Sequence, residues 1–481
     1  MLIMYKIDET PKEGEISFII NKIKANFIIG HPTYNNQDNI GSLIEKDIKG
    51  ILKYIKENSL IIISDGTKTI ENDDKSVFEA IEKIFPILKE KYEQNLNNLN
   101  IDVAILVSMY DGYMGNRIPG KGSALKLIYS EVYNSNFGEF LTLLDGDLRN
   151  DVNEWIGVYK KIIEYHKENF GDKPLFVTAK YARHFVDASL TRFIVSPLTT
   201  GFGMFVPGGI SGDIFLNKKA VENEIKAKWS ENRYKYGTDI STTIDNIVNG
   251  TIIYEAYLGA KLHDITDEAK LAIMPREVIG AILEKFIEKE KENGIISKIK
   301  QEKLELKFPI IFDSSKTGID FIDPGYTDVF NIDVKTTNLI EKFIDYKNSI
   351  EKVFGTSFAK EIEKRVEKLK ENYKNENNKI LFLDINRDLW IDILNKALNY
   401  ILSTEDVENT KTALSYLYTA SFLEFVKEKL EFLNIKTYKE IRKKQKKLGV
   451  PKEIAKEFYE KEVDEKIKDM SIKFYNLFIG G

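Results

Sequence analysis

The stretch GEFLTLLDGDLRN, residues 138–150, decides the fold, because its apolar run ends in two aspartates, Asp145 and Asp147. The run is short and continuous, which predicts a buried strand of a parallel sheet. Such sheets bind ligands beyond the carboxyl ends of their strands, where the two carboxylates would lie. Two hard oxygen ligands there indicate a site for Mg²⁺ or Mn²⁺, which would in turn hold a diphosphate. An ordinary turn after a strand is the alternative.

Short apolar runs alternate with helix-patterned stretches through about residue 260. The runs predicted as strands are 26–30, 60–64, 101–108, 139–144, 174–179 and 251–258. The stretches predicted as helices between them include 38–56, 76–92, 122–134 and 152–166. This alternation predicts an α/β, Rossmann-like fold, with a mostly parallel sheet covered by helices on both faces.

The residue composition changes near residue 275. Beyond it the chain is rich in charged residues, poor in glycine and shows the apolar spacing of helices. The predicted helices there are 277–293, 337–354, 358–375, 384–402, 410–433 and 452–478. Residues 306–327 are predicted as strand or loop, and as a hinge region. We therefore expect two domains, residues 1–275 for catalysis and residues 276–481 as a mainly helical C-terminal domain. Homo-oligomerisation through the helical domain is a further hypothesis.

Composition excludes several function classes. With 70 Lys and Arg against 75 Asp and Glu, the net charge is -5, which argues against nucleic acid as a partner. The basic run 439–447 is interpreted as a solvated helix face. The chain has no cysteine, which excludes disulfides and thiolate sites. It shows neither a signal-peptide pattern nor an apolar run long enough for a transmembrane segment, so we expect a cytoplasmic protein.

The stretch RIPGKG, residues 117–122, precedes a predicted helix. Glycines such as Gly120 let a backbone approach phosphate, and the start of a helix offers N–H donors. Lys121 would add a point charge. The spacing is not that of a P-loop. An ordinary helix start with an exposed lysine is the alternative.

Histidines are few, and His263 is the most informative of the four. It follows the predicted strand 251–258, where an imidazole could complete the metal shell begun by the two aspartates. A structural or exposed role is the alternative. We expect His31, after the first predicted strand, to line a nucleotide pocket, and His166 to lie at the surface.

Polar residues follow the first two predicted strands, in HPTYN (31–35) and SDGT (64–67). They could contact a base and ribose, with Asp65 accepting from a base N–H or a sugar hydroxyl. Plain turn chemistry is the alternative. The glycine-rich stretch 201–213 could shape a sugar or acceptor pocket. In YGTD, residues 236–239, Asp239 would occupy the first turn of a helix, where the helix dipole favours an acid in any case. The proposed contacts to base and ribose are Pro32, Thr33, Asn35 and Asp65.

Taken in order, these motifs resemble the retaining GT-A glycosyltransferases that make glucosylglycerate-type solutes. This group contains the glucosyl-3-phosphoglycerate, glucosylglycerate and mannosylglycerate synthases. The resemblance extends from Phe27 to Asp264 and rests on PxxN, GKGxAL, DxD, a Thr before a Pro-Leu pair, a Gly-acidic pair, YGxD and LGxxxH. It implies the GT-A fold.

The resemblance also implies residue roles. Asp145, Asp147 and His263 would bind the metal, and Asp145 would in addition contact the donor nucleotide. Gly120, Lys121 and Gly212 would bind the donor. Lys121, Asp213 and Asp239 would be the catalytic residues, with Asp213 standing where the family usually has Glu. Retention would proceed by front-face attack, with the leaving phosphate helping to take the acceptor proton.

Departures from the pattern bear on the acceptor. Thr191 would touch the acceptor carboxylate. Phosphoglycerate-using members have Arg where this chain has Ser189, and Arg-Asn where it has Asp264–Ile265. The extra acid repels a phosphate dianion. Arg183 or Arg192 could compensate for the lost phosphate-binding side chains, although neither is in register. We therefore favour D-glycerate over 3-phosphoglycerate.

The sequence thus predicts a metal-dependent hexosyltransferase that moves glucose or mannose from a UDP- or GDP-sugar to a small hydroxy acid, making a compatible solute. A glycosyltransferase acting on a glycan or glycolipid is one alternative. A catalytically silent scaffold with a helical interaction domain is another. A sugar nucleotidyltransferase is disfavoured, because GHPTYNNQ is not the glycine-rich basic loop expected after its first strand.

Overall fold

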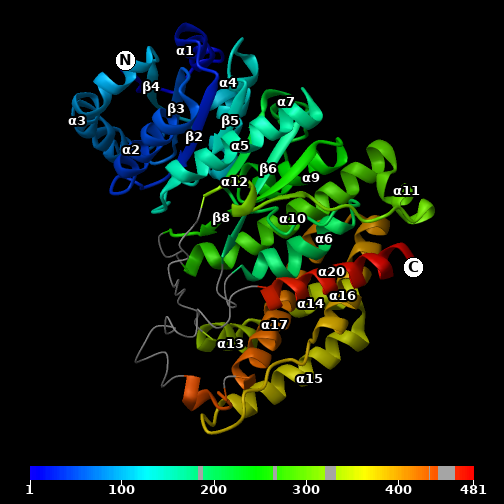
Figure 1. Ribbon diagram of the computed structural model, residues 1–481. Coiled ribbons are helices and arrows are strands. Elements are labelled where there is room, and N and C mark those ends of the chain that lie inside the picture. The colour runs from blue at the N-terminus through cyan, green and yellow to red at the C-terminus, as the bar shows by residue number, and fades with distance from the viewer. Residues whose placement is uncertain (183–187, 264–267, 320–331, 433, 442–460, 481) are drawn as a thin grey trace. The chain divides into compact units, whose positions relative to one another are not determined.

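The computed structural model describes residues 1–182, 188–263, 268–319, 332–432, 434–441 and 461–480 (Figure 1). The described residues form one nine-stranded sheet and many helices. The strand order is β1-β4-β3-β2-β5-β7-β6-β8-β9. The strands are β1 (Leu2–Ile7), β2 (Phe27–Thr33), β3 (Ser59–Asp65), β4 (Val103–Met109), β5 (Phe140–Leu143), β6 (Leu175–Ala182), β7 (Ile214–Asn217), β8 (Ile252–Ala260) and β9 (Ile310–Phe312).

Five neighbouring strands, from β1 to β5, run parallel, and β7 pairs antiparallel with both β5 and β6. Strands β3 and β4 are buried along their whole length. Their continuous Ile, Leu and Val runs fit this environment. Helices cover both faces of a parallel sheet, so side chains on both faces are buried and the strands do not alternate between apolar and polar residues. The predicted α/β class with a mainly parallel sheet is confirmed.

Helices that lie between the strands in sequence cover both faces of the sheet. On one face, α2, α3 and α5 contribute to a core with Ile61, Ile63, Ile105 and Val107. On the other, α4 packs against β2, β3, α1 and α7. The helices are α1 (Glu15–Ile23), α2 (Ile40–Gly50), η1 (Ile51–Ile55), α3 (Ser76–Leu99), η2 (Tyr113–Gly115), α4 (Lys121–Asn134), α5 (Val152–Phe170), α7 (Lys218–Lys226), α8 (Glu231–Tyr234), α9 (Thr238–Val248) and α12 (Ser314–Thr317).

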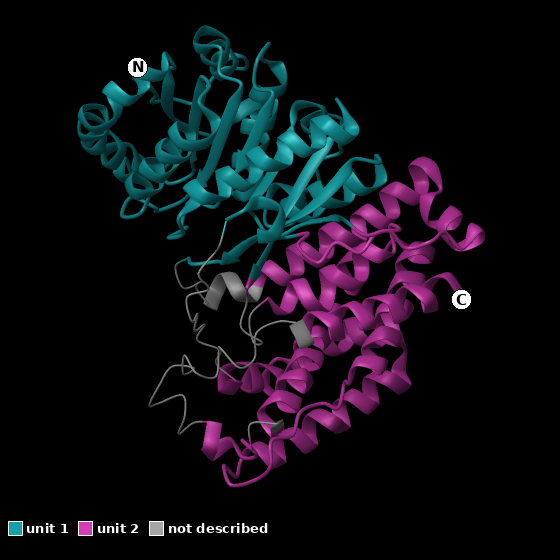
Figure 2. Ribbon diagram, viewed as in Figure 1, with its two compact units in different colours: residues 1–181, 210–265, 309–322 teal, residues 182–209, 266–308, 323–481 magenta. Residues whose placement is uncertain are grey.

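The chain divides into two compact units that are discontinuous in sequence (Figure 2). Unit 1 is Met1–Tyr181, Ile210–Ile265 and Pro309–Ile322, and unit 2 is Ala182–Gly209, Thr266–Phe308 and Asp323–Gly481. The sequence prediction divided the chain at one point, between residues 275 and 276. It did not anticipate that residues 182–209 join the helical unit or that β9 joins the sheet. A segment that leaves its unit and returns has no signature in local periodicity.

Unit 2 is mainly helical, as predicted. Its largest buried side chain, Trp390, donates its indole N–H to the carbonyl of Phe193 at 2.8 Å. None of the helices within the described ranges is long and apolar enough to cross a membrane. The helices are η3 (Thr191–Val195), α6 (Ser196–Thr200), α10 (Glu268–Asn293), α11 (Ile295–Glu302), α13 (Ile332–Glu341), α14 (Phe343–Phe354), α15 (Thr356–Tyr373), α16 (Arg387–Thr404), α17 (Val407–Phe432) and α20 (Lys461–Gly480).

A buried charge network in unit 1 anchors the segment between α7 and α9. The guanidinium of Arg233, 1% exposed, lies 2.6 Å from Glu224 and 2.6 Å from Asp245. Both acids are also buried. The indole ring of Trp229 lies 4.5 Å from the guanidinium carbon. Because the arginine compensates two carboxylates that cannot reach water, its removal would leave both buried without this cation.

We predict that Arg233→Met lowers the free energy of unfolding by about 3–5 kcal/mol, measured by urea denaturation, because two buried carboxylates lose their cation. Adding Glu224→Gln and Asp245→Asn to this variant should recover part of the loss. Lys161→Ala, which removes an exposed partner of Glu164, serves as the control and should cost less than about 1 kcal/mol. A loss of similar size in both single variants would contradict the assigned role of the network.

Candidate functional site

Charged residues from separate parts of unit 1 meet where β5 ends. Asp145 and Asp147 follow β5, and Asp213 directly precedes β7. Lys261 and His263 follow β8, while Lys121 begins α4 and Asp239 lies in the first turn of α9. The carboxyl ends of parallel strands form the ligand-binding edge of such a sheet.

The carboxylate of Asp145 lies between two lysine ammonium groups. Lys121 Nζ is 2.7 Å from one carboxylate oxygen, and Lys261 Nζ is 2.7 Å from the other. Burial alone would raise the pKa of Asp145, but the two lysines hold it well below its usual range. Burial would likewise lower the pKa of both lysines, yet the surrounding acids raise it. All three groups are therefore charged at neutral pH.

Asp213 is completely buried and contacts both Asp145 and Lys261. It accepts a hydrogen bond from the backbone N–H of Asp145 at 2.9 Å, and its other oxygen lies 2.6 Å from Lys261 Nζ. The hydroxyl of Tyr181 also donates to it. Gly212 has a φ of +79°, and a Cβ there would lie 2.5 Å from Asp145. Only glycine is thus compatible with this turn and with the closeness of Asp145.

Asp147 and His263 are brought side by side by backbone pairing. Leu148 and His263 form an antiparallel bridge. The Arg149 N–H donates to the Leu262 carbonyl at 2.8 Å, and the Asn150 amide donates to the Ala260 carbonyl at 2.6 Å. The segment after β5 is therefore tied to the segment after β8. The pairing places the sequence-predicted acid and imidazole next to each other.

Among the described residues, Asp147 is the acid of this group that forms no direct ion pair, although the charges of Lys261 and His263 act on it from further away. Its pKa is raised, first by burial and next by the negative charge of Asp145. Four carboxylates and two ammonium groups give the group a formal charge of two negative. No ready-made cluster of three metal-ligating side chains occurs among the described residues. Asp147, His263 and the excess negative charge nevertheless fit a hard divalent cation that completes its shell with ligand oxygens.

Asp239 forms an ion pair with Lys121, the lysine that also contacts Asp145. One of its oxygens lies 3.0 Å from Lys121 Nζ, and the other, Oδ1, is buried and has no hydrogen-bond partner among the residues that the structure describes. Burial raises the pKa of Asp239, and Lys121 offsets this only in part. A buried carboxylate oxygen without a donor is costly unless a ligand supplies one. Asp239 therefore has one acceptor atom available for a hydroxyl group.

The glycines of RIPGKG have a different role from the predicted one. A Cβ on Gly122 would lie 2.0 Å from the Arg233 carbonyl, and one on Gly120 would lie 2.7 Å from the Tyr234 carbonyl. The Gly122 N–H donates to the Lys235 carbonyl at 3.2 Å, and the Gly120 N–H donates to the Tyr110 hydroxyl at 3.3 Å. These glycines let α4 begin against residues 233–235. The lysine side chain, rather than free backbone donors, is what this loop presents.

The polar residues after β2 and β3 bond mainly to one another. Thr33 donates to Asp65 at 2.8 Å, and the Asn35 N–H donates to Thr67 at 2.6 Å. Asp65 is fully buried, which raises its pKa, and it also accepts from the Lys68 N–H. Pro32 is half-buried. A contact from these residues to a nucleotide stays a prediction.

Two histidines differ from the expectations. His31 is completely buried between Asp47 and the carbonyl of Leu144, so it does not line a pocket. His166 is 3% exposed, contacts the Tyr254 hydroxyl and the Lys173 carbonyl, and is therefore not at the surface. His31 lies within a strand and His166 on the buried face of α5, and a polar residue in either position gives no sign of burial.

The predicted acceptor residues Ser189, Thr191 and Arg192 all belong to unit 2. Thr191 begins the π-helix η3, a geometry that is frequent at functional sites. Arg192 is 4% exposed, and Ser189 bonds to the Tyr418 hydroxyl. Arg183, Asp264 and Ile265, on which the acceptor argument also depends, lie outside the described residues.

Sequence reasoning missed Lys261 and Tyr181. Lys261 is 8% exposed, and its ammonium contacts Asp145, Asp213 and the Ser211 carbonyl. It stands two residues before His263, and residues two apart in an extended chain point to the same side. That spacing was an available signal. Tyr181 offered none, because its contact with Asp213 depends on the pairing of β6 with β7.

No family model and no curated protein matches the chain. Solved structures do, among them glucosyl-3-phosphoglycerate synthase from Mycobacterium tuberculosis. Its complex with Mn²⁺, UDP and glucosyl-3-phosphoglycerate is 18% identical, with a TM-score of 0.36, over 58% of this chain and 87% of that chain. Its complex with Mn²⁺, UDP-glucose and glycerol 3-phosphate is also 18% identical to this chain, with a TM-score of 0.37. That match covers 58% of this chain and 87% of that chain. The search therefore returns the enzyme that the sequence motifs resemble.

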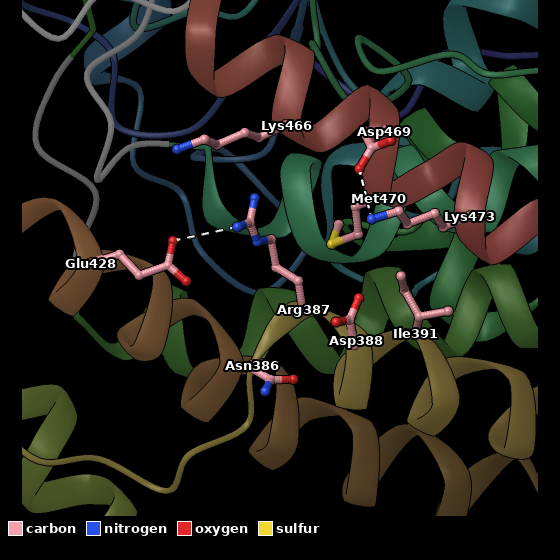
Figure 3. A pocket seen from close by; sticks show the side chains of 9 residues that line it. All are labelled: Asn386, Arg387, Asp388, Ile391, Glu428, Lys466, Asp469, Met470 and Lys473. Atoms are coloured by element: carbon pink, nitrogen blue, oxygen red, sulfur yellow. Dashed lines mark ion pairs between the residues drawn. The ribbon is translucent and has the colours of Figure 1, made fainter.

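Unit 2 contains a separate cavity of about 210 Å³ at the start of α16, between α17 and α20 (Figure 3). Its charges are balanced. Arg387 lies 3.7 Å from Glu428, and Lys473 lies 3.1 Å from Asp469. It therefore favours ligands of neither charge. The lining residues are Asn386, Arg387, Asp388, Ile391, Glu428, Lys466, Asp469, Met470 and Lys473.

We predict that Asp147→Asn raises the free energy of unfolding at pH 7. A carboxyl group whose pKa is raised by folding is destabilising above that folded pKa and neutral below the unfolded value, near 4. The gain from the substitution should therefore be present at pH 7 and shrink as the pH falls toward about 4. Urea denaturation at both pH values measures it.

Asp151→Asn is the matched control, because Asp151 is an exposed acid at the end of the same loop. Its effect should stay within about 0.5 kcal/mol at both pH values. If Asp147→Asn instead destabilises the protein at pH 7, the carboxylate has a compensating partner, and the assignment of an uncompensated acid is wrong.

Proposed function

We propose that this chain is a metal-dependent glycosyltransferase that transfers a hexose from a nucleotide-sugar to a small hydroxy acid. The observation that carries the proposal is the group of four carboxylates and two buried lysines at the end of β5, in which Asp147 forms no direct ion pair among the described residues. A diphosphate alone would be repelled by this excess of negative charge. A divalent cation would neutralise the excess of two negative charges, and it could then attract the diphosphate to the site.

Asp147 and His263 would hold the cation, and Asp145 would hold the lysines. Both oxygens of Asp145 are already occupied by ammonium groups. When bound, the cation supplies charge neutralisation for the departing nucleotide diphosphate. This division assigns Asp145 a different task from the metal ligation first expected of it. Its lysines can move from the carboxylate to phosphate oxygens with little loss of ion pairing, because one anion replaces another.

Lys121 and Lys261 would stabilise the leaving diphosphate from two sides. In the transfer, the bond between the anomeric carbon and the phosphate oxygen breaks, and the acceptor hydroxyl oxygen bonds to that carbon. The acceptor proton passes to the leaving phosphate oxygen, so the step balances without a separate base. Asp239, with one unpaired buried oxygen, would accept from a hydroxyl of the transferred sugar. Front-face attack with retention is the mechanism that the sequence resemblance favours.

For the acceptor we favour D-glycerate. Ser189 stands where phosphoglycerate-using relatives of the sequence pattern have arginine, and Asp264 adds an acid where they have a base. Thr191 would then contact the acceptor carboxylate.

The test is product formation by purified protein with Mn²⁺ or Mg²⁺, crossing UDP-, GDP- and ADP-glucose and the corresponding mannose donors with D-glycerate and 3-phosphoglycerate. We expect transfer to D-glycerate. Asp147→Ala should lower kcat/KM at least about 100-fold, because charge on the leaving group is no longer neutralised. Asp151→Ala should leave it within about twofold. The coupling constant of the product's anomeric proton, measured by NMR, reports retention.

Each other outcome has a defined meaning. Transfer only to 3-phosphoglycerate would contradict the acceptor argument and keep the reaction class. Donor hydrolysis without transfer would indicate a different acceptor, such as a glycan. If no donor is consumed under any metal, the chain is not a glycosyltransferase, and a binding scaffold becomes the better account.

A further inference from the structure

The pairing of β2 with β5 lacks one hydrogen bond at the point where the site begins. The Leu144 N–H donates to the Gly30 carbonyl at 3.0 Å, continuing the parallel register in which Gly30 faces Leu143. In a parallel ladder, the Leu144 carbonyl would next accept from the N–H two residues beyond Gly30. That residue is Pro32, which has no N–H. The carbonyl directly before Asp145 therefore cannot complete the ladder.

The side chain of His31 supplies the missing donor. Its Nδ1 lies 3.1 Å from the Leu144 carbonyl oxygen, and the imidazole is completely buried. A carbonyl oxygen can only accept, so Nδ1 must carry the hydrogen. The imidazole thus replaces the backbone N–H that proline removes, and it holds the last peptide before the DxD turn.

The other ring nitrogen fixes this orientation. His31 Nε2 lies 2.7 Å from Asp47 Oδ2 on α2, and both side chains are inaccessible to solvent. Burial raises the pKa of Asp47, although His31 counteracts this. The second Asp47 oxygen has no hydrogen-bond partner in the described part of the chain, so the imidazole is the contact there on which this buried carboxyl depends. Asp47 orients the ring in the way that outer carboxylates orient metal-bound or catalytic histidines.

We propose that His31 is a positioning residue for the nucleotide-diphosphate site, because its Nδ1–H holds the Leu144 carbonyl in place of the donor missing at Pro32. It acts through Asp145, whose backbone N–H and carboxylate are aligned toward Asp213 and the two lysines. Loss of this bond would free the DxD turn while leaving the sheet paired. The inference rests on the proposed function only in naming a nucleotide diphosphate as the ligand whose binding would be weakened.

Two substitutions separate the two bonds of the ring. In His31→Asn the amide nitrogen can occupy the place of Nδ1, so the Leu144 bond is kept and the Asp47 bond is lost. In His31→Gln the amide nitrogen reaches the place of Nε2, so the Asp47 bond is kept and the Leu144 bond is lost. Both variants are polar amides in the same buried site. Both should therefore be destabilised by similar amounts in urea.

UDP binding in the presence of Mn²⁺, measured by calorimetry, is the functional readout. We expect His31→Gln to raise the Kd about tenfold or more and His31→Asn to stay within about threefold of the wild type. Adding Pro32→Ala to His31→Gln restores a backbone donor and should recover part of the affinity. Hydrogen exchange of a peptide covering residues 144–150 should be faster in His31→Gln than in His31→Asn.

The outcomes distinguish this inference from the proposed function. If the wild type binds UDP and the two variants are weakened equally, His31 is only a stabilising residue and the inference is overturned. Should the wild type bind no UDP, the titration is repeated with GDP and ADP; if none of the three binds, the proposed donor class is wrong, and the exchange difference alone decides whether His31 positions the turn. Equal exchange in both variants overturns the inference in either case.

Discussion

The arrangement at the end of β5 depends on one interaction, the carboxylate of Asp145 held between the ammonium groups of Lys121 and Lys261. Each of these groups would be unfavourable alone, because burial disfavours charge. Together they stay ionised, since each offsets the burial cost of the others. Asp213 and Asp239 add further negative charge next to the lysines, Asp213 at Lys261 and Asp239 at Lys121. The two lysines are shared by three carboxylates, so the group keeps its lysines charged and in place while carrying an excess of negative charge.

The fold explains how residues so far apart in sequence can meet. Parallel strands place their carboxyl ends along one edge, and the antiparallel strand β7 brings Asp213 in from the opposite direction. The backbone bridge between Leu148 and His263 closes the arrangement. Glycines are needed where the chain passes closest, at Gly212 against Asp145 and at Gly122 against the carbonyl of Arg233. The buried Arg233 network in turn holds the segment against which α4 and its Lys121 begin.

The sequence predicted the α/β sheet, most of its parallel strands and the mainly helical second part, because long apolar or amphipathic periods are local signals. It did not predict the strand β7, which is four residues long and follows a glycine-rich stretch, nor the exchange of segments between the two units. Asp145, Asp147 and His263 were named from strand ends and Lys121 from a glycine-containing stretch before a helix, and the structure brings Lys121 into contact with Asp145. Lys261 was missed although its spacing from His263 was visible. His31 was misplaced, because its partner Asp47 lies on a helix that local patterns cannot position.

The most direct test of the central claim is a calorimetric titration of UDP into the purified protein, with Mn²⁺ and then with EDTA. The account predicts binding that requires the cation, because the carboxylates exceed the lysines and would repel the diphosphate. It also predicts that Lys261→Met weakens this binding more than Lys161→Met does. Equal affinity in Mn²⁺ and in EDTA would contradict the account, since the lysines alone would then suffice to hold the nucleotide.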